Sequence, residues 1–410
     1  MPPTEQTPLE DVLVAESEHW GDGPPHALFA QLRERCPVHW TSHITEQPEE
    51  AGFWSVTRPE DIHTVSRDFH TYSSASGVTA VTDVFPLELQ QAMFIGMDPP
   101  RHDRLKNLFQ AGFTPRRIAD HEGEIRRIAV DVLDGVAGRE RGDLVADVAQ
   151  PVVSRVIGSF MGVPPDEDAE WARLMNAALS FGDEMFDPEG EQTLREQTLP
   201  EVFRRCSALI AARRAQPTDD LTSLLVHAEI DGESLTDPEI VMGFFLLMAA
   251  GNDSTKATFC ALMRALIEDP TQRDALLADP SLIPGAVEEA LRMFPAFAHF
   301  RRTATCDTEL GGQTIHEGDK VVMWYVASGR DPERYPDPDR FDVRRSAEHQ
   351  AFGAGGRHFC LGTALARLEL RVLLEETLVR YPLMALDGAP TWVPSAFLNQ
   401  LRTLPVRFAG

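Results

Sequence analysis

The chain has 410 residues, a formal net charge of −26 and five cysteines. The acidic balance, with no basic block, excludes nucleic acid as an expected partner. Scattered cysteines do not form a disulfide framework and indicate a reducing, cytoplasmic location. The polar, proline-rich N-terminus predicts neither a signal peptide nor a membrane anchor, and residues 1–11 are expected to be flexible. The longest apolar run, residues 240–251, is too short to span a bilayer.

The N-terminal quarter predicts a small sheet between short helices. Residues 25–36 have helical periodicity, and residues 38–42 and 53–57 alternate as two antiparallel strands do. Pro59 opens another helix. Residues 75–96 read as a loop whose apolar side chains, Phe85 and Phe94 among them, either line a pocket or pack as an ordinary loop.

A helix is predicted after Met97, with Pro100 in its first turn and Asp98 near its cap. His102 and Lys106 are four residues apart and therefore share one face of this helix. A histidine and a cation on one face suit an anionic group. A solvated helix face is the alternative interpretation.

A long central helix follows several shorter ones over residues 116–228, from which no chemistry can be read. It begins at the capping box of residues 236–239 and ends before Pro270, so about 30 residues give it a length of roughly 45 Å. Gly251, an acid and two hydroxyls interrupt its apolar centre at residues 249–255. Hydroxyls there can divert a backbone hydrogen bond, and a glycine permits close approach of a ligand. The alternative is a core helix with a satisfied polar patch.

Glu289 and Arg292 have the spacing of an i, i+3 ion pair on a further helix. The same spacing recurs at three other places, where an exposed pair of little energetic value is expected. What distinguishes Glu289 and Arg292 is their place between the central helix and Cys360. Residues 320–325 predict a strand, and the proline-rich residues 330–342 an irregular segment.

Residues 351–362 place four glycines around Cys360, and a helical pattern runs from Thr363 to about Arg380. The glycines let the backbone adopt positive φ and approach a flat ligand. Cys360 thus lies at a helix N-terminus, where the dipole favours the metal-binding thiolate. Gly362 removes a side chain that would crowd the sulfur. A buried, inert cysteine is the alternative, although no zinc pattern surrounds it.

This stretch resembles the haem-binding signature of the cytochrome P450 family, Phe-Gly-x-Gly-x-His-x-Cys-x-Gly. Phe352 lies eight positions before Cys360 rather than the usual seven, as in some lipid-, sterol- and terpenoid-oxidising members. Residues 98–106, 249–255, 289–292 and 302–307 are similar to the family's other motifs and follow in the family's order. Lys106 replaces the usual arginine, and Ser254 the usual threonine.

The resemblance implies a haem b group held by the Cys360 thiolate. It implies a role in binding the cofactor for Cys360, His102, Lys106, Arg302, His358, Phe352, Gly362 and Ala250. Asp253, Ser254 and Thr255 are then the residues that deliver protons during oxygen activation. Glu289 and Arg292 take a structural role behind the haem. The implied fold is mainly α, one large P450 domain over residues 1–410 with small antiparallel sheets.

The implied activity is a monooxygenase that hydroxylates a lipophilic small molecule resembling a terpenoid, sterol or fatty acid. Substrate-lining candidates are Phe85, Phe94, Phe297 and Phe397, with residues 180–186 at the entrance. We expect a monomer that takes two electrons from a ferredoxin or similar carrier with its reductase. An acidic carrier is expected to dock on Arg104, Arg116, Arg117, Arg357 and Arg367.

Three alternatives remain at this point. A peroxide-driven haem peroxygenase of the same fold would not need Asp253 and Ser254, so their presence argues against it. A non-catalytic haem sensor or carrier would not need Asp253 and Ser254 either, so the same two residues argue against it. A helical protein with an inert cysteine is disfavoured by the order of the motifs.

Overall fold

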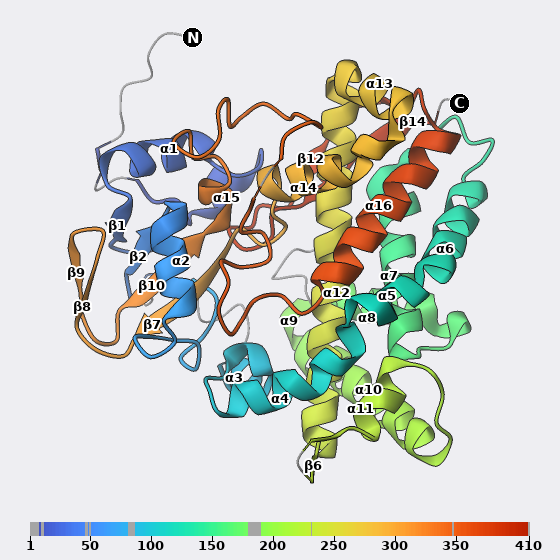
Figure 1. Cartoon of the computed structure of the whole chain (residues 1–410), viewed down its shortest axis with the longest axis horizontal. Coiled ribbons are helices and arrows are strands. Elements are labelled where there is room, and N and C mark those ends of the chain that lie inside the picture. The colour runs from blue at the N-terminus through green and yellow to red at the C-terminus, as the bar shows by residue number, and fades with distance from the viewer. Residues whose placement is uncertain are drawn as a thin grey trace.

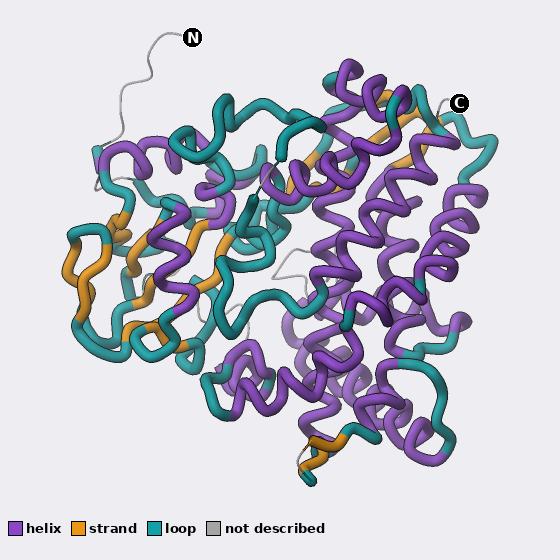
Figure 2. The backbone as a smooth tube through the Cα atoms, viewed as in Figure 1, coloured by secondary structure: helices purple, strands orange, loops and turns teal. Residues whose placement is uncertain are grey.

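The structure, a computed structural model, describes residues 8–9, 12–45, 48, 51–80, 87–178, 190–230, 232–346 and 348–408. A region built around a sheet and a larger helical region lie side by side, at the left and right of Figure 1. Figure 2 shows loops running between the two regions. Phe85, residues 180–186 and nearly all of residues 1–11 lie outside the described residues, so their expected roles stay predictions.

The main sheet has five strands in the order β1-β2-β10-β7-β3. Their bounds are β1 (Val38–Thr41), β2 (Phe53–Val56), β10 (Lys320–Trp324), β7 (His299–Ala304) and β3 (Tyr72–Ser73). The predicted antiparallel pair of β1 and β2 is confirmed, and β10 runs parallel to β2. Alternate residues of β10 point to opposite faces of the sheet, and both faces are buried. On one face Val322 and Trp324 pack with Phe29, and on the other Val321 packs with Ile62. Helices α1 (His26–Arg35) and α2 (Pro59–Arg67) supply these two partners.

Four smaller sheets complete the strands among the described residues. One contains three strands: β11 (Ala385–Leu386), β14 (Pro405–Arg407) and β4 (Arg141–Asp143). The other three are two-stranded: β12 (Thr391–Trp392) with β13 (Leu401–Thr403), β5 (Glu229–Ile230) with β6 (Glu233–Ser234), and β8 (Thr308–Leu310) with β9 (Gln313–Ile315). All of these pairs are antiparallel.

The remaining helices, except α15 (Tyr325–Ser328), which packs with α1 beside the main sheet, form the larger region, with one extended apolar core. In the first half of the chain they are α3 (Leu87–Ala92), α4 (Arg101–Gln110), α5 (Pro115–Asp120), α6 (Glu122–Gly135), α7 (Gln150–Met161), α8 (Asp168–Ala178) and α9 (Gly190–Thr193). Then follow α10 (Leu199–Ala215), α11 (Leu221–Val226), α12 (Asp237–Glu268), α13 (Pro270–Ala278), α14 (Ile283–Met293) and α16 (Thr363–Arg380). Helix α12 crosses the whole region beside α16 (Figure 1). Among the described residues, none of the helices combines the length and apolar character that crossing a membrane requires.

Two local predictions need correction. Residues 75–96 are not all loop, because α3 lies within them; its only buried described residue is the polar Gln90, so it has no apolar period to detect. Asp98 does not cap α4, which has no side-chain cap. Its carboxylate instead accepts hydrogen bonds from the Ser73 hydroxyl and, at 2.9 Å, from the Ser74 N–H. The capping box of α12, formed by Thr236 and Glu239, is confirmed.

Candidate active site

The loop of residues 351–362 delivers Cys360 to the N-terminal end of α16. The N–H of Cys360 donates to the Phe352 carbonyl at 2.9 Å and closes the loop. Positive φ is confirmed at Gly353, Gly355 and Gly356. A Cβ on Gly356 would lie 2.5 Å from the Ser66 carbonyl oxygen, so α2 and the loop approach each other too closely for any other residue.

Lys106 clasps this loop from α4. Its Nζ donates to the carbonyl oxygens of Arg357 and, at 2.7 Å, Phe359. Those two residues flank His358 and precede Cys360, so the cation fixes the backbone that carries the thiol. His102 and Lys106 do share one face of α4, since both border the cavity. Lys106 also binds the backbone of the loop.

The accessible surface of Cys360 borders a cavity of about 270 Å³. Burial raises the pKa of the Cys360 thiol, while the Gly362 N–H and the charges of Lys106 and Arg367 lower it. The prediction that an N–H group at the helix start favours the thiolate holds for Gly362, but burial of the thiol opposes it and is the larger effect. A cation bound at the sulfur would reverse this balance.

Helix α12 forms another wall of the same cavity with Ala250, Ser254 and Thr255. The Ser254 hydroxyl donates to the Ala250 carbonyl at 2.9 Å. Helix α12 nevertheless stays continuous through this turn, so the helix is not opened there. Gly251 has an additional role that the sequence did not reveal. A Cβ there would lie 2.8 Å from Ile157, so Gly251 lets α12 and α7 cross closely.

Asp253 is buried and paired with a partner that no sequence motif indicated. Lys256 lies three residues further along α12; its Nζ forms an ion pair with the Asp253 carboxylate and donates to Gln150 Oε1 at 2.6 Å. Gln150 in turn donates to Asn252 at 3.0 Å. The polar centre of α12 is thus a satisfied network that reaches α7, and it also borders the cavity through Asp253.

Glu369 on α16 is a cavity residue that no sequence motif indicated. Its carboxyl group is buried, and burial raises its pKa to about 8 against a hydrogen bond with Thr255 that lowers it. At neutral pH the group is therefore a protonated acid beside the hydroxyls of α12. Apolar positions at helical spacing surround it in the sequence, so it could have been noticed as a charge on an apolar helix face.

We expect Glu369→Gln to gain stability relative to the wild-type protein as the pH rises. The unfolded carboxyl releases its proton near 4.5, whereas the folded one keeps it to about 8. Folding binds a proton between these values, so wild-type stability falls with rising pH, by up to about 1.4 kcal/mol per unit. Thermal unfolding of both proteins between pH 5.5 and 8 measures this. A pH-independent difference in melting temperature would show that Glu369 is already ionised.

The predicted aromatic lining is present where it can be checked. Phe94, Phe297 and Phe397 all border the cavity, and their aromatic rings come from three separate segments. Phe297 and Phe397 pack together with ring centroids 5.2 Å apart. Apolar side chains predominate among the other described lining residues of α12 and α16.

Four basic side chains are among the described residues that border the same cavity: His102, Lys106, Arg302 and His358. The rings of His102 and His358 lie 4.2 Å apart. His358 Nε2 is 3.1 Å from the Ser74 hydroxyl, whereas His102 Nε2 is buried without a hydrogen-bond partner among the described residues. Burial lowers the pKa of all four groups, and neighbouring cations lower it further for the two histidines.

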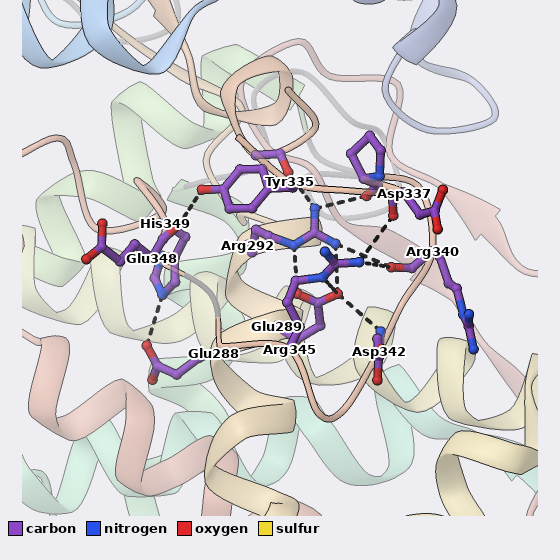
Figure 3. A network of polar contacts seen from close by, with 12 residues as sticks. Glu288, Glu289, Arg292, Tyr335, Asp337, Arg340, Asp342, Arg345, Glu348 and His349 are labelled. Atoms are coloured by element: carbon purple, nitrogen blue, oxygen red, sulfur yellow. Dashed lines mark hydrogen bonds and ion pairs between the residues drawn. The ribbon is translucent and has the colours of Figure 1, made fainter. Parts of the chain in front are cut away.

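Glu289 and Arg292 are not among the residues that border the cavity. They belong to a buried polar network (Figure 3). Two hydrogen bonds of 2.7 and 2.8 Å join them, and both side chains are fully buried. Glu289 also pairs with Arg345 at 2.9 Å and accepts the Asp342 N–H at 3.1 Å. Arg292 reaches the carbonyl of Pro338 at 2.9 Å. The pair therefore ties α14 to the irregular segment that precedes the Cys360 loop.

The family model for cytochrome P450 matches residues 16–398. The chain belongs to the cytochrome P450 family. A methyl-branched lipid omega-hydroxylase of Mycobacterium bovis is 33% identical, over 99% of this chain and 97% of its own length. Linalool 8-monooxygenase of Pseudomonas putida is 34% identical, over 93% and 95%. A Mycobacterium marinum cytochrome P450 solved with pseudoionone has a TM-score of 0.90 at 36% identity, covering 99% of this chain and 100% of that one.

Haem is the cofactor of cytochrome P450 enzymes, and the described residues of this P450 fit it. The Cys360 sulfur borders the cavity. A Cβ on Gly362 would lie 4.0 Å from that sulfur, an ordinary van der Waals distance, so it would not crowd the sulfur, contrary to the prediction. His102 Nδ1 lies 2.9 Å from the Asp103 carboxylate, whereas its Nε2 is buried without a hydrogen-bond partner among the described residues. Arg302 adds a buried positive charge to the same cavity. Two propionate carboxylates would suit these groups.

Proposed function

We propose that this cytochrome P450 hydroxylates a lipophilic terpenoid, sterol or fatty-acid-like molecule, using O₂ and two electrons from a ferredoxin-type carrier. One observation carries the proposal: the Cys360 sulfur, the hydroxyls of Ser254 and Thr255, and apolar walls border a single cavity. Haem held by the Cys360 thiolate would supply oxygen activation and oxidation of a C–H bond.

The cavity residues would take distinct roles in holding the haem. Cys360 would be the metal ligand, with Phe352, Gly362 and Ala250 against the porphyrin. His102, Arg302 and His358 would receive the propionates. Lys106 would act mainly on the loop, because its Nζ already donates to two loop carbonyls.

On the α12 side, Ser254 would pass protons through its hydroxyl, and Thr255 with the neutral Glu369 would support it. Asp253, whose carboxylate Lys256 holds in place, would take up a proton from water and pass it on toward Ser254. Serine lacks the methyl group that fixes the threonine rotamer, so the Ser254 hydroxyl rotates more freely. We therefore expect a smaller fraction of the supplied electrons to end in hydroxylated product than with threonine at this position.

We expect Lys256→Met to destabilise the holoprotein by about 3–5 kcal/mol, because it leaves the Asp253 carboxylate buried without a counter-charge. The double variant Asp253→Asn/Lys256→Met should recover a large part of this loss. Urea unfolding of the haem-loaded proteins measures both. Equal destabilisation in the single and double variants would mean that the two charges do not stabilise each other.

The substrate class is inferred from the cavity and from the relatives. Described aromatic residues from three segments enclose the cavity, which suits a molecule with few polar groups. The named relatives act on a methyl-branched lipid and on linalool. A panel of terpenoids, sterols and fatty acids tests the proposal through the substrate-induced spin shift and product formation with a ferredoxin and its reductase. Turnover with peroxide alone would favour a peroxygenase instead.

The expected basic docking surface is largely neutralised. Carboxylates pair with four of its five arginines: Arg104 with Glu233 and Glu239, Arg117 with Asp219, Arg357 with Asp103, and Arg367 with Glu288. Electrostatic attraction between a strongly acidic carrier and these five arginines as a group is therefore weak. We propose instead that a ferredoxin-type carrier in the cytoplasm docks over the Cys360 loop, where Arg357 is about half exposed.

Charge reversal at Arg357→Glu should slow electron transfer from the carrier about tenfold at low salt, because it leaves Asp103 unpaired beside the loop. Arg380→Glu is the matched control. Arg380 also pairs with carboxylates, Asp134 and Glu376, but lies at the other end of α16, roughly 25 Å along the helix. Stopped-flow reduction under CO measures both. Equal rates in the two variants would place the docking site elsewhere.

A further inference from the structure

His299 is the first residue of β7 and is 2% exposed. Its Nε2 accepts the Ala80 N–H at 2.9 Å, and its Nδ1 lies 2.8 Å from the Ala396 carbonyl oxygen. Because Nε2 is an acceptor, the ring proton is on Nδ1, which donates to Ala396. A neutral imidazole is therefore needed, since it offers one donor and one acceptor on opposite sides of one ring.

The two backbone groups that His299 joins belong to separate walls of the cavity. Val78 borders the cavity two residues before Ala80, and Phe397 borders it directly after Ala396. These segments are more than 300 residues apart in the sequence. The imidazole is thus a bridge between an early wall and a late wall of the substrate space.

Main-chain hydrogen bonds align the same three segments. The Arg301 N–H donates to Val78 at 2.7 Å, and the Ala298 N–H donates to Phe397 at 2.8 Å. The His299 ring packs edge-on against Trp324 at 4.7 Å and against Phe397 at 5.4 Å. The bridge therefore has a defined orientation, set by aromatic rings on two of its sides.

We propose that His299 is a positioning residue for the substrate, which holds residues 78–80 and 396–398 at a fixed separation through its two ring nitrogens. Buried amide and carbonyl groups rarely go without partners. Losing the imidazole would make Ala80 and Ala396 find new ones, and the walls would move. The inference rests on the proposed function only in that a lipophilic molecule occupies the cavity.

Three variants separate the two arms of the bridge. His299→Phe keeps an aromatic ring but removes both hydrogen bonds. His299→Asn places its amide near the position of Nδ1 and can keep the bond to Ala396. His299→Gln reaches the position of Nε2 and can keep the bond to Ala80. The matched control is His39→Phe, a buried histidine on β1 of the same sheet whose pKa is likewise lowered by burial.

Two azole probes report on the cavity without a known substrate. Imidazole binds the haem iron alone, whereas 1-dodecylimidazole also fills the lipophilic cavity. In His299→Phe we expect affinity for 1-dodecylimidazole to fall about tenfold and affinity for imidazole to stay within about twofold. His39→Phe should leave both unchanged. Equal affinities for both probes in His299→Phe and wild type would overturn the proposal.

Hydrogen exchange provides a readout that does not require His299→Phe to fold. His299→Asn should speed exchange in residues 76–80, and His299→Gln in residues 395–398. If both variants open the same segments, or neither, the bridge does not exist as described. Failure of imidazole to bind the wild-type protein would instead contradict the haem site, so the two failures are distinguishable.

Discussion

Cys360→Ser is expected to abolish monooxygenase activity while the chain still folds. Serine keeps the size and the hydrogen-bonding backbone of the loop, but its hydroxyl is a far weaker donor to iron than a thiolate. The reduced-CO complex should lose the red-shifted Soret band that reports thiolate ligation. Product formation should fall roughly 1,000-fold, which corresponds to about 4 kcal/mol of transition-state stabilisation.

The loop geometry makes this outcome specific to Cys360. Its sulfur borders the cavity, whereas Cys206 and Cys260 are buried in the apolar core. Cys306 is exposed, and Cys306→Ser is therefore the control that should leave the Soret band and the activity unchanged. A red-shifted band that survives in Cys360→Ser would mean that another group binds the iron.

The Cys360 loop was predictable because its signal is local. Three glycines with positive φ, one cysteine and the start of a helix all fall within twelve residues, so spacing alone constrains their arrangement. The start of α12 was predictable for the same reason, since the capping box joins Thr236 to Glu239 within one turn. Lys256 follows Asp253 by three residues, and that spacing could have revealed their ion pair before the structure did.

Other contributions to the site depend on contacts between distant segments. Thr255 and Glu369 meet only because α12 packs on α16, and His299 reaches Ala80 and Ala396 only through the sheet. No periodicity in the sequence encodes such pairings. The positive patch expected from the surface arginines was wrong for the same reason. Their carboxylate partners come from elements far along the chain and neutralise them.

Arg292→Leu is expected to cost about 3–5 kcal/mol and to prevent stable haem incorporation, because it leaves the Glu289 carboxylate buried with only Arg345 to compensate it. It also deprives the Pro338 carbonyl of its donor and so loosens the segment that leads into the Cys360 loop. Arg204→Leu is the matched control, since Arg204 pairs with Glu201 at the same i, i+3 spacing on an exposed face. Urea unfolding and haem content should change little there. If both variants lose the same stability, burial does not distinguish the two pairs, and the structural role of Arg292 fails.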